Sequence, residues 1–329
     1  MSDKVRVAVV GCGSMGVDLA RQIVQVDAGK LVAVLDIDPS KAQPLADELG
    51  AEAVTTRHEL LARDDVDAVF IATPGWAHTE WVVAAFGARK HVFVEKPMAL
   101  LPKDCEEMIR AGKAASRKLM VGQVLRYIHV FAFTDDLVRK GRLGQVVSIR
   151  ITRSTFGWGG SVRPWRATAQ KCGGLLFEVS IHELDFMLHI LGEASAVHSF
   201  ANHKVVRDID YPDTVMVNLQ FKSGAVAQLC AGLADRVGSY AGEIVGTEGA
   251  VHFDSGRGEI ITKLGDAEPT TTNFRDLDLE HPVRREVREF LEAVRDDTPV
   301  TIPGEDGLRV VRAATAAVAS AATGRVVQP

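Results

Sequence analysis

Cysteine is scarce in this sequence, and long hydrophobic runs are absent. The four cysteines are widely separated and form no Cys-x-x-Cys pair, so neither a disulfide framework nor a zinc site is indicated. No uninterrupted apolar stretch approaches the roughly 18 residues that a membrane-spanning helix needs. Residues 1–10 lead into a strand-like run without the layout of a signal peptide. We therefore expect a cytoplasmic protein with reduced thiols and no membrane partner.

A strong excess of charge of one sign is also lacking. Lys and Arg total 38 against 43 Asp and Glu, which gives a formal net charge of −5. Without a broad basic surface, binding to nucleic acid or anionic lipid is not expected. The chain has 329 residues, 47% of them hydrophobic. At roughly 100 to 200 residues per domain, this length predicts two globular domains with proper cores.

The first part of the chain has the pattern of a parallel α/β sheet. Short β-branched runs alternate with helical patterns, and the connections suit right-handed β-α-β units. Helices are expected from Ser40 to Leu49, closed by Gly50, and from Pro102 to about Ser116. The predicted buried strands are Val5 to Val10, Leu31 to Leu35, Val66 to Ala72, His91 to Val94 and Leu119 to Val121. This pattern predicts a doubly wound parallel sheet over residues 1–122.

The pattern changes after about residue 123 to longer, alternating strands. One strong helix interrupts them, predicted from Leu175 to Leu191 and ended by Gly192. The clearest strands are Val146 to Thr155, Val215 to Phe221 and Ala225 to Leu229, the last two joined by the hairpin Lys222-Ser223-Gly224. We predict an α+β domain over residues 123–329, built on an open and largely antiparallel sheet. Two last helices, near 283–295 and 305–323, are expected to pack on this sheet or back on the first domain.

A glycine-rich motif follows the first predicted strand directly. Gly11-Cys12-Gly13-Ser14-Met15-Gly16 matches Gly-x-Gly-x-x-Gly, and an amphipathic helix to about residue 26 follows it. In this strand-to-helix context the motif is typical of a Rossmann dinucleotide site. The first glycine permits the tight turn, the second lets the backbone approach a pyrophosphate, and the third allows close helix–strand packing. The helix N-terminus adds free N–H donors, among them those of Ser14 and Met15.

The end of the second predicted strand carries an acidic residue that bears on cofactor choice. Asp36 lies 20 residues after Gly16, where a carboxylate can accept hydrogen bonds from the adenosine ribose hydroxyls. With Asp38 nearby and no Arg immediately following, a 2′-phosphate would meet like charge, so NAD is favoured over NADP. The alternative is that Asp36 caps the helix that starts near Pro39.

Several further motifs together resemble those of one enzyme family. Ala72-Thr73-Pro74 is followed by His78, and the fifth predicted strand ends in Glu95-Lys96-Pro97. Later in the chain come Gly122 to Arg126, Trp165-Arg166, Gly173-Gly174, Glu178, His182 and Gly246-Thr247-Glu248-Gly249. With the glycine motif, this order resembles the glucose-fructose oxidoreductase and inositol dehydrogenase family (Gfo/Idh/MocA) over nearly the whole chain. The resemblance implies an NAD(P)-dependent oxidoreductase that moves a hydride between the nicotinamide and a secondary alcohol of a sugar or cyclitol.

The resemblance also implies which residues surround the reacting carbinol. In the family these are the Lys of Glu-Lys-Pro and a later His preceded four residues earlier by an Asp, which corresponds to Lys96, His182 and position 178. This sequence has Glu178 there. Spaced i, i+4 on one predicted helix, Glu178 and His182 would project from one face and could hydrogen-bond. We assign His182 as the base and Lys96 as the cation that lowers the pKa of the hydroxyl, with the reverse assignment left open. His182 is also compatible with a satisfied core histidine.

Other residues are assigned from the resemblance to cofactor or substrate. Thr73, Pro74, His78 and Glu95 are placed with Lys96 around the cofactor, His78 as a helix cap close to the nicotinamide end. Arg126, Trp165 and Tyr240 match positions that often line the sugar pocket, although an Arg at a domain junction and a buried aromatic are as readily structural. Asp185, one turn beyond His182, is expected to hold a backbone group or a neighbouring Arg. No metal site is expected.

Alternatives remain for the function and for the assembly. An enzyme of this fold can hold NAD tightly and oxidise a sugar transiently, so that it acts overall as a glycosidase or lyase. A non-catalytic sensor of NAD and metabolite is the second alternative, which the presence of both Lys96 and His182 disfavours. Because the alternating strands of the second domain leave a sheet face that the late helices do not obviously cover, we expect a homodimer or homotetramer.

Overall fold

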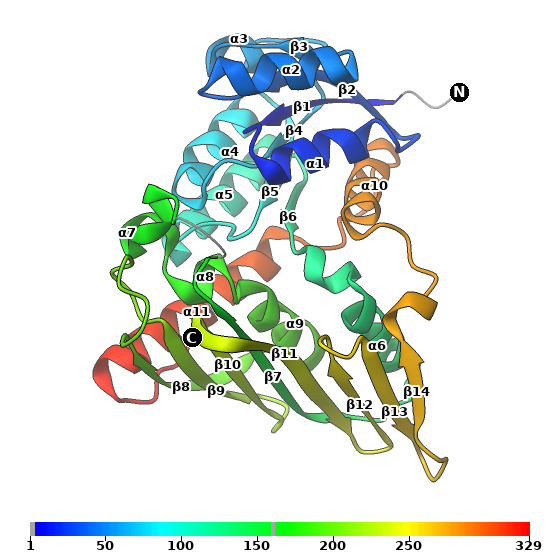
Figure 1. Cartoon of the computed structure of the whole chain (residues 1–329). Helices are drawn as coiled ribbons and strands as arrows, with labels where there is room; N and C mark the ends of the chain where they lie inside the picture. The colour runs from blue at the N-terminus through cyan, green and yellow to red at the C-terminus, as the bar shows by residue number, and fades with distance from the viewer. Residues whose placement is uncertain (1–3, 159–161) are drawn as a thin grey trace. The chain divides into compact units, whose positions relative to one another are not determined.

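The computed structural model describes residues 4–158 and 162–329, and the chain divides into two compact units (Figure 1). Unit 1 comprises Met1–Val124 and Glu280–Leu308, and unit 2 comprises Leu125–Leu279 and Arg309–Pro329. Over the described residues, no helix combines the length and the apolar character that crossing a membrane requires. All four cysteines carry free thiols.

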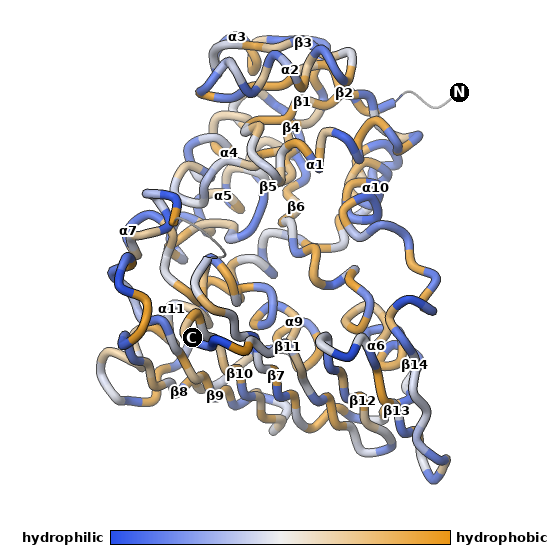
Figure 2. The backbone as a smooth tube through the Cα atoms, viewed as in Figure 1, coloured by the Kyte–Doolittle hydropathy of each residue, from blue (hydrophilic) through white to orange (hydrophobic). Residues whose placement is uncertain are grey.

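Unit 1 contains a six-stranded, fully parallel sheet in the order β3-β2-β1-β4-β5-β6. Its strands are β1 (Val5–Val10), β2 (Gly29–Leu35), β3 (Glu52–Ala53), β4 (Ala68–Ile71), β5 (His91–Glu95) and β6 (Leu119–Gly122). The central strand β4 is a continuous apolar run and β1 is apolar except for Arg6, as expected for a sheet that is buried on both faces, and both are coloured mostly orange in Figure 2. This order confirms the predicted doubly wound sheet. The sequence pattern missed β3, whose two residues are too few to show a periodicity.

The helices of unit 1 begin and end at the expected signals. They are α1 (Ser14–Ile23), α2 (Pro39–Leu49), α3 (Arg57–Leu61), α4 (His78–Gly87), α5 (Pro102–Ala115) and α10 (Pro282–Arg295), with a 3₁₀ turn η1 (Gly75–Ala77) before α4. Gly50 ends α2 in the left-handed region at φ 66°. Pro102 occupies the first turn of α5, where its missing N–H has no helical partner to lose.

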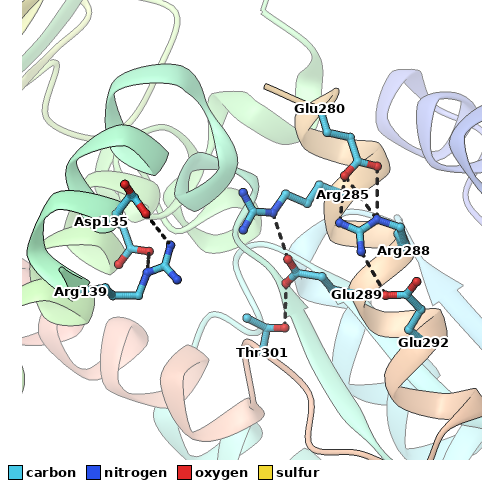
Figure 3. A network of polar contacts seen from close by, with 9 residues as sticks. Asp135, Arg139, Glu280, Arg285, Arg288, Glu289, Glu292 and Thr301 are labelled. Carbon is cyan, nitrogen blue, oxygen red and sulfur yellow. Dashed lines mark hydrogen bonds and ion pairs between the residues drawn. The ribbon is translucent and has the colours of Figure 1, made fainter. Parts of the chain in front are cut away.

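The late helix α10 belongs to unit 1. Phe290 of α10 packs edge-on against Phe70 at 5.3 Å between ring centroids, and Phe70 stacks on Phe93 at 4.7 Å. Arg284 donates to Gln22 of α1 at 3.0 Å. On its solvent side α10 carries ion pairs drawn in Figure 3: Arg288 with Glu280 and Glu292, and Arg285 with Glu289. The aromatic contacts bury the apolar face of α10 against the central strands.

Unit 2 contains an eight-stranded sheet in the order β14-β13-β12-β11-β7-β10-β9-β8. The strands are β7 (Val146–Phe156), β8 (Ala194–Asn202), β9 (Thr214–Phe221), β10 (Val226–Gly232), β11 (Ala234–Gly246), β12 (Gly249–Asp254), β13 (Glu259–Leu264) and β14 (Thr270–Asn273). The named strand pairs are antiparallel except β7 with β10. The predicted open, largely antiparallel sheet is therefore confirmed, as is the hairpin at residues 222–224 between β9 and β10.

Helices of unit 2 cover one face of this sheet. They are α6 (His129–Arg139), α7 (Ala169–Cys172), α8 (Leu175–Glu178), α9 (Ile181–Leu191) and the larger part of α11 (Gly304–Thr323), with 3₁₀ turns η2 (Val124–Tyr127), η3 (Pro164–Ala167) and η4 (Phe274–Asp276). Phe131 of α6 packs edge-on against Phe186 of α9 at 4.9 Å. On the surface of α6, Arg139 pairs with Asp135 one turn earlier, as Figure 3 shows.

The prediction of one continuous helix over residues 175–191 is wrong. The helix is interrupted between α8 and α9, where Val179 ends the first segment and Ser180, at φ −102° and ψ 12°, precedes the second. The Ser180 amide bonds back to the carbonyl of Leu175, five residues earlier, at 3.2 Å. Apolar periodicity runs across this interruption, because both segments bury their faces, and the sequence pattern therefore does not reveal it.

Candidate active site

Parallel pairing brings several candidate residues of unit 1 to one edge of its sheet. Val10 at the end of β1 pairs with Leu35 of β2 and with Ile71 of β4, and Ile71 pairs with Val94 of β5. The carboxyl ends of these strands therefore lie side by side, which is where open parallel sheets bind ligands. The residues that follow the strands, or end them, are Gly11, Asp36, Thr73, Glu95 and Lys96.

The three motif glycines have different surroundings. Gly11 has φ +92°, and a Cβ there would lie 2.7 Å from the carbonyl oxygen of Ala72. A Cβ on Gly16 would lie 1.7 Å from the Gly11 oxygen, so α1 approaches the end of β1 too closely for any side chain. A Cβ on Gly13 would meet nothing within 4 Å. The first and third glycines thus serve the turn and the packing, whereas the second borders open space.

Asp36 accepts backbone hydrogen bonds at both carboxylate oxygens. The amide of Cys12, within the glycine loop, donates to Oδ2 at 2.7 Å, and the amide of Asp38 donates to Oδ1 at 2.8 Å. The alternative that Asp36 caps the following helix is wrong, because the N-cap of α2 is Asp38, which accepts from the Ser40 amide at 3.1 Å. Asp36 therefore ties the glycine loop to the end of β2.

His78 lies buried beneath the same edge. Its Nδ1 lies 2.9 Å from the carbonyl oxygen of Pro97 and its Nε2 lies 2.7 Å from that of Thr73. Burial lowers the pKa of this imidazole below its usual value. The expectation that His78 caps α4 is wrong: the N-cap residue is Ala77, with no side-chain cap bond. The ring connects the turn after β4 to the turn after β5.

Glu95 and Lys96 end the fifth strand. The Lys96 amide donates to Glu95 Oε2 at 3.1 Å. Glu95 is only 6% exposed, and burial raises the pKa of its carboxyl to about 7. A Cβ on Gly122 of β6 would lie 3.0 Å from Glu95 Oε1, so this glycine leaves room for the carboxyl. Glu95 is therefore a buried acid beneath the Lys96 backbone.

The helix interruption in unit 2 separates the two acid–base candidates there. Glu178 is the last residue of α8, and His182, 9% exposed, is the second residue of α9. Arg166 of η3 donates from Nε to Glu178 Oε1 at 2.7 Å. Its guanidinium also lies 4.9 Å from the ring centroid of Trp165 and 5.1 Å from that of Trp158. Two indole rings therefore fix the cation that holds Glu178.

The three residues expected to line a substrate pocket all have partners within unit 2. Arg126 forms a buried two-point ion pair with Asp185, at 2.6 Å from Nε to Oδ2 and 2.7 Å from Nη2 to Oδ1. This pair agrees with the expectation that Asp185 holds a neighbouring Arg. Tyr240 donates its hydroxyl to Glu183 Oε1 at 2.8 Å. Trp165, as described, contacts Arg166. A role of any of them in substrate binding stays a prediction.

Comparison with known protein families accounts for both units. The model of an oxidoreductase family with an NAD-binding Rossmann fold matches residues 5–123, and the model of the α/β C-terminal domain of the same family (Gfo/Idh/MocA) matches residues 135–328. Together these segments cover nearly the whole chain. The chain belongs to the Gfo/Idh/MocA oxidoreductase family. The resemblance drawn from the motifs is confirmed, and so is NAD as the cofactor of the N-terminal domain.

Individual members of the Gfo/Idh/MocA family differ in what their names say they do. A segment of this chain is 32% identical to 2,7-anhydro-N-acetylneuraminate hydratase of Mediterraneibacter gnavus over 75% of this chain and 66% of that protein. The chain thus spans about two thirds of that relative. It is 28% identical to myo-inositol 2-dehydrogenase of Thermotoga maritima over 92% of both chains. Both are named as enzymes, in line with an enzyme rather than a sensor.

Solved structures of the family have the same fold over the full length. One of them, described as GenD2 from gentamicin A biosynthesis in complex with NAD, is 28% identical at a TM-score of 0.84 and covers 100% of this chain and 97% of its own. Levoglucosan dehydrogenase, in complex with NADH and L-sorbose, is 25% identical at a TM-score of 0.87, with 99% of both chains covered.

The edge of unit 1 has the features that a dinucleotide needs. Gly13 borders open space at the start of α1, whose first amides have no helical acceptors, and this combination suits a pyrophosphate. Beside Asp36, the side chain of Ile37 is 98% exposed and offers an apolar surface for a flat base. The hydroxyl oxygen of Thr73 is buried and has no hydrogen-bond partner among the residues that the structure describes. These residues therefore fit NAD. Lys96 follows β5, the strand beside β4.

Three functional candidates were missed by sequence reasoning. Ile37 is an apolar residue next to an expected ribose ligand, and its exposure is visible only in the fold. Arg166 stands in the sequence motif Trp165-Arg166, but its pairing with Glu178 is visible only in the fold. Glu183, next to His182, is fully buried and bonds both Tyr240 and Arg153. A charged residue on an otherwise apolar helix face was the available signal for Glu183.

The contrast between Gly13 and Gly16 can be tested with two alanine variants. In Gly16→Ala the new methyl meets the Gly11 carbonyl, so we expect unfolding free energy to fall by about 1–3 kcal/mol or more. In Gly13→Ala we expect unchanged stability but weaker NAD binding, because the methyl occupies the side open to the pyrophosphate. Thermal unfolding and calorimetric titration with NAD measure the two effects. Equal stability of the two variants would contradict the packing role of Gly16.

The buried acid Glu95 predicts a pH dependence of stability. Because its folded-state pKa, about 7, is above the unfolded value, the stability it contributes is complete below pH about 4.5 and is lost as pH rises through 7. The advantage of Glu95→Gln over wild type in unfolding free energy should therefore grow by about 2–3 kcal/mol between pH 5 and 8. Urea titrations at both pH values measure it. Glu48→Gln, which removes an exposed carboxylate paired with Arg21, is the control and should show no such growth.

Proposed function

We propose that this family member is an NAD-dependent dehydrogenase that oxidises a secondary alcohol of a sugar, cyclitol or related polyol. The observation that carries the proposal is the carboxyl edge of unit 1, where parallel pairing places Asp36, the open side of Gly13 and Lys96 along one line of strand ends. The name of the Thermotoga maritima relative supports a cyclitol, and that of levoglucosan dehydrogenase supports a sugar. A panel of myo-inositol, levoglucosan, aldoses and other polyols, screened with NAD at 340 nm, tests the proposal.

The residues of this chain supply the acid–base part of the reaction. The chemistry that NAD supplies when bound is acceptance of a hydride from the carbinol carbon. Oxidation also needs a base for the hydroxyl proton and a cation for the developing alkoxide. We assign His182 as the base, whose imidazole takes the proton of the substrate hydroxyl. Lys96 is assigned as the cation beside the developing alkoxide. Since Glu178 is bonded by Arg166, it holds an ion pair beside the helix interruption and is not our choice of base.

A hydratase or lyase that uses NAD transiently is the second candidate. The observation that favours it is the 32% identity to 2,7-anhydro-N-acetylneuraminate hydratase, and the protein of the same name in Escherichia coli K12 is 31% identical. Such an enzyme would turn over a sugar substrate without net accumulation of NADH. Product analysis of each panel incubation, with NADH followed at 340 nm, separates it from the dehydrogenase.

We also propose that the protein assembles as a homodimer or homotetramer in the cytoplasm. The face of the unit 2 sheet away from α9 carries exposed apolar side chains on three strands: Phe200 is 63% exposed, Met216 50% and Val226 52%. Phe200 of β8 pairs with Met216 of β9, so these two form one row across the strands. A concavity of about 500 Å³ lies on the same strands, lined among others by His198, Gln220 and Val226. A second copy of this chain would bury this face.

The cofactor preference is predicted from Asp36. We expect kcat/KM with NAD to exceed that with NADP at least tenfold, equivalent to about 1.4 kcal/mol, because a 2′-phosphate would meet the carboxylate. Asp36→Ala should lose much of this discrimination and keep its fold. Kinetics with both cofactors measure the ratio. An unchanged ratio in the variant would show that Asp36 only ties the loop to β2.

The catalytic assignment is tested by removing each side chain. His182→Ala and Lys96→Ala should each lose on the order of a hundredfold to ten-thousandfold in kcat while NAD affinity stays within a few-fold. Alcohol oxidation by wild type should rise with pH, because the base must be deprotonated and imidazole titrates near neutrality. Steady-state kinetics with the best panel substrate and NAD titration provide the measurements. If His182→Ala kept wild-type kcat, the assignment of the base would be wrong.

The assembly is tested on the exposed sheet face. Met216→Glu places a charge in the apolar row without touching the core, since Met216 is half-exposed in the single chain. We expect wild type to run as a dimer or tetramer in light scattering at micromolar concentration and the variant to shift toward the monomer mass. Lys103→Glu, at an exposed position of α5 in unit 1, is the surface control away from this sheet face and should keep the wild-type mass. A monomeric wild type would rule the proposal out.

A further inference from the structure

Arg153 bridges the two sides of the helix interruption that precedes His182. Arg153 lies on β7, and its Nη1 donates both to the carbonyl oxygen of Val179 at 3.2 Å and to Glu183 Oε1 at 2.7 Å. Val179 is the C-cap residue that follows α8, and Glu183 lies in the first turn of α9. One guanidinium nitrogen therefore contacts the residues three before and one after His182.

The carboxylate that Arg153 contacts is buried and shared with a second donor. Glu183 is 0% exposed, and its Oε1 also accepts from the Tyr240 hydroxyl at 2.8 Å. Tyr240 pairs with Arg153 across β11 and β7, and the guanidinium carbon lies 5.3 Å from its ring centroid. Phe131 and Phe253 pack around the tyrosine ring at 6.0 and 5.8 Å. Oε1 of Glu183 thus connects the start of α9 to strand β7 through Arg153 and to the aromatic core through Tyr240.

Two polar atoms beside His182 are buried and have no hydrogen-bond partner among the described residues. They are the hydroxyl oxygen of Ser180 and Oε2 of Glu183. Leaving a buried polar atom unpaired costs on the order of 1–3 kcal/mol. The interruption is therefore not the arrangement that satisfies the local polar groups best, and contacts from outside the helix must hold it in place.

We propose that Arg153, through Val179 and Glu183, is a positioning residue that sets where the His182 imidazole lies. The proposal rests on the proposed function in one respect, that His182 is the base. Helix α9 lies on β7 in Figure 1, and the rigid strand provides a fixed point for its first turn. Arg suits this role because a planar guanidinium keeps its orientation when it donates to two acceptors, whereas an ammonium group does not. Tyr240 also donates a hydrogen bond to the Glu183 carboxylate, and this contact does not involve substrate.

Enzyme kinetics separate positioning from substrate contact and from stability. Arg153→Met should lower kcat about 10- to 100-fold, because displacement of a catalytic group by about 1 Å has effects of this size. KM and NAD affinity should stay within about threefold. Arg153→Lys should recover part of kcat, and Tyr240→Phe should show a smaller loss. Arg139→Met, which removes an exposed ion pair of α6, is the control with unchanged kinetics. The substrate is myo-inositol, or the panel member with the highest kcat/KM, assayed well below the melting temperature of every variant.

A second measurement needs neither substrate nor cofactor. The imidazole ¹⁵N signals of His182, assigned by their loss in His182→Asn, should move in Arg153→Met and stay in place in Arg139→Met. A rise in KM alone, unmoved imidazole signals, or wild-type kcat in Arg153→Met would overturn the positioning role. If the signals moved while His182→Ala remained active, the positioning would stand and the assignment of His182 as base would fail. The two failures are therefore distinguishable.

Discussion

Parallel pairing of the strands in unit 1 is the constraint on which the cofactor site depends. Since β1, β2, β4 and β5 run in one direction and pair in register at their ends, whatever follows each strand is brought to one edge. The sequence separates Gly11 from Lys96 by most of the domain, yet both lie at this edge. Two links then connect the turns: Asp36 accepts hydrogen bonds from the glycine loop and from the Asp38 amide after β2, and the buried His78 ring lies between the carbonyls of the turns after β4 and β5.

In unit 2, charged side chains lie buried within an apolar layer of helices. Three buried carboxylates of α8 and α9 are each met by an arginine: Asp185 by Arg126, Glu178 by Arg166 and Glu183 by Arg153. Breaking such a pair leaves an uncompensated buried charge, so the pairs restrict where each helix start can lie. Glu178 and Glu183 stand on either side of His182, which places the candidate base between two fixed points.

This arrangement changes the meaning of two residues that the family resemblance had assigned to the substrate pocket. Tyr240 supports Glu183, and Trp165 stacks on the arginine that holds Glu178. Both therefore act first on the carboxylates beside His182. The replacement of the family's Asp by Glu at position 178 comes with Arg166 as partner, so the longer side chain reaches a cation. Relatives that share this scaffold are named both as a dehydrogenase and as a hydratase, so the fold alone does not fix the reaction.

The sequence by itself determined the Rossmann sheet, the glycine motif, the family and NAD as cofactor, because each depends on local signals: apolar runs, turn glycines and an acid at a set spacing. It also separated the two sheets by the change from buried runs to alternating strands. Only the tertiary structure decided that α10 packs on unit 1, that Asp38 and not Asp36 caps α2, and that the helix over 175–191 is interrupted. It also decided the partners of Glu178 and Glu183. Hydrogen bonds between residues far apart in the chain make these choices, and no periodicity along the sequence encodes them.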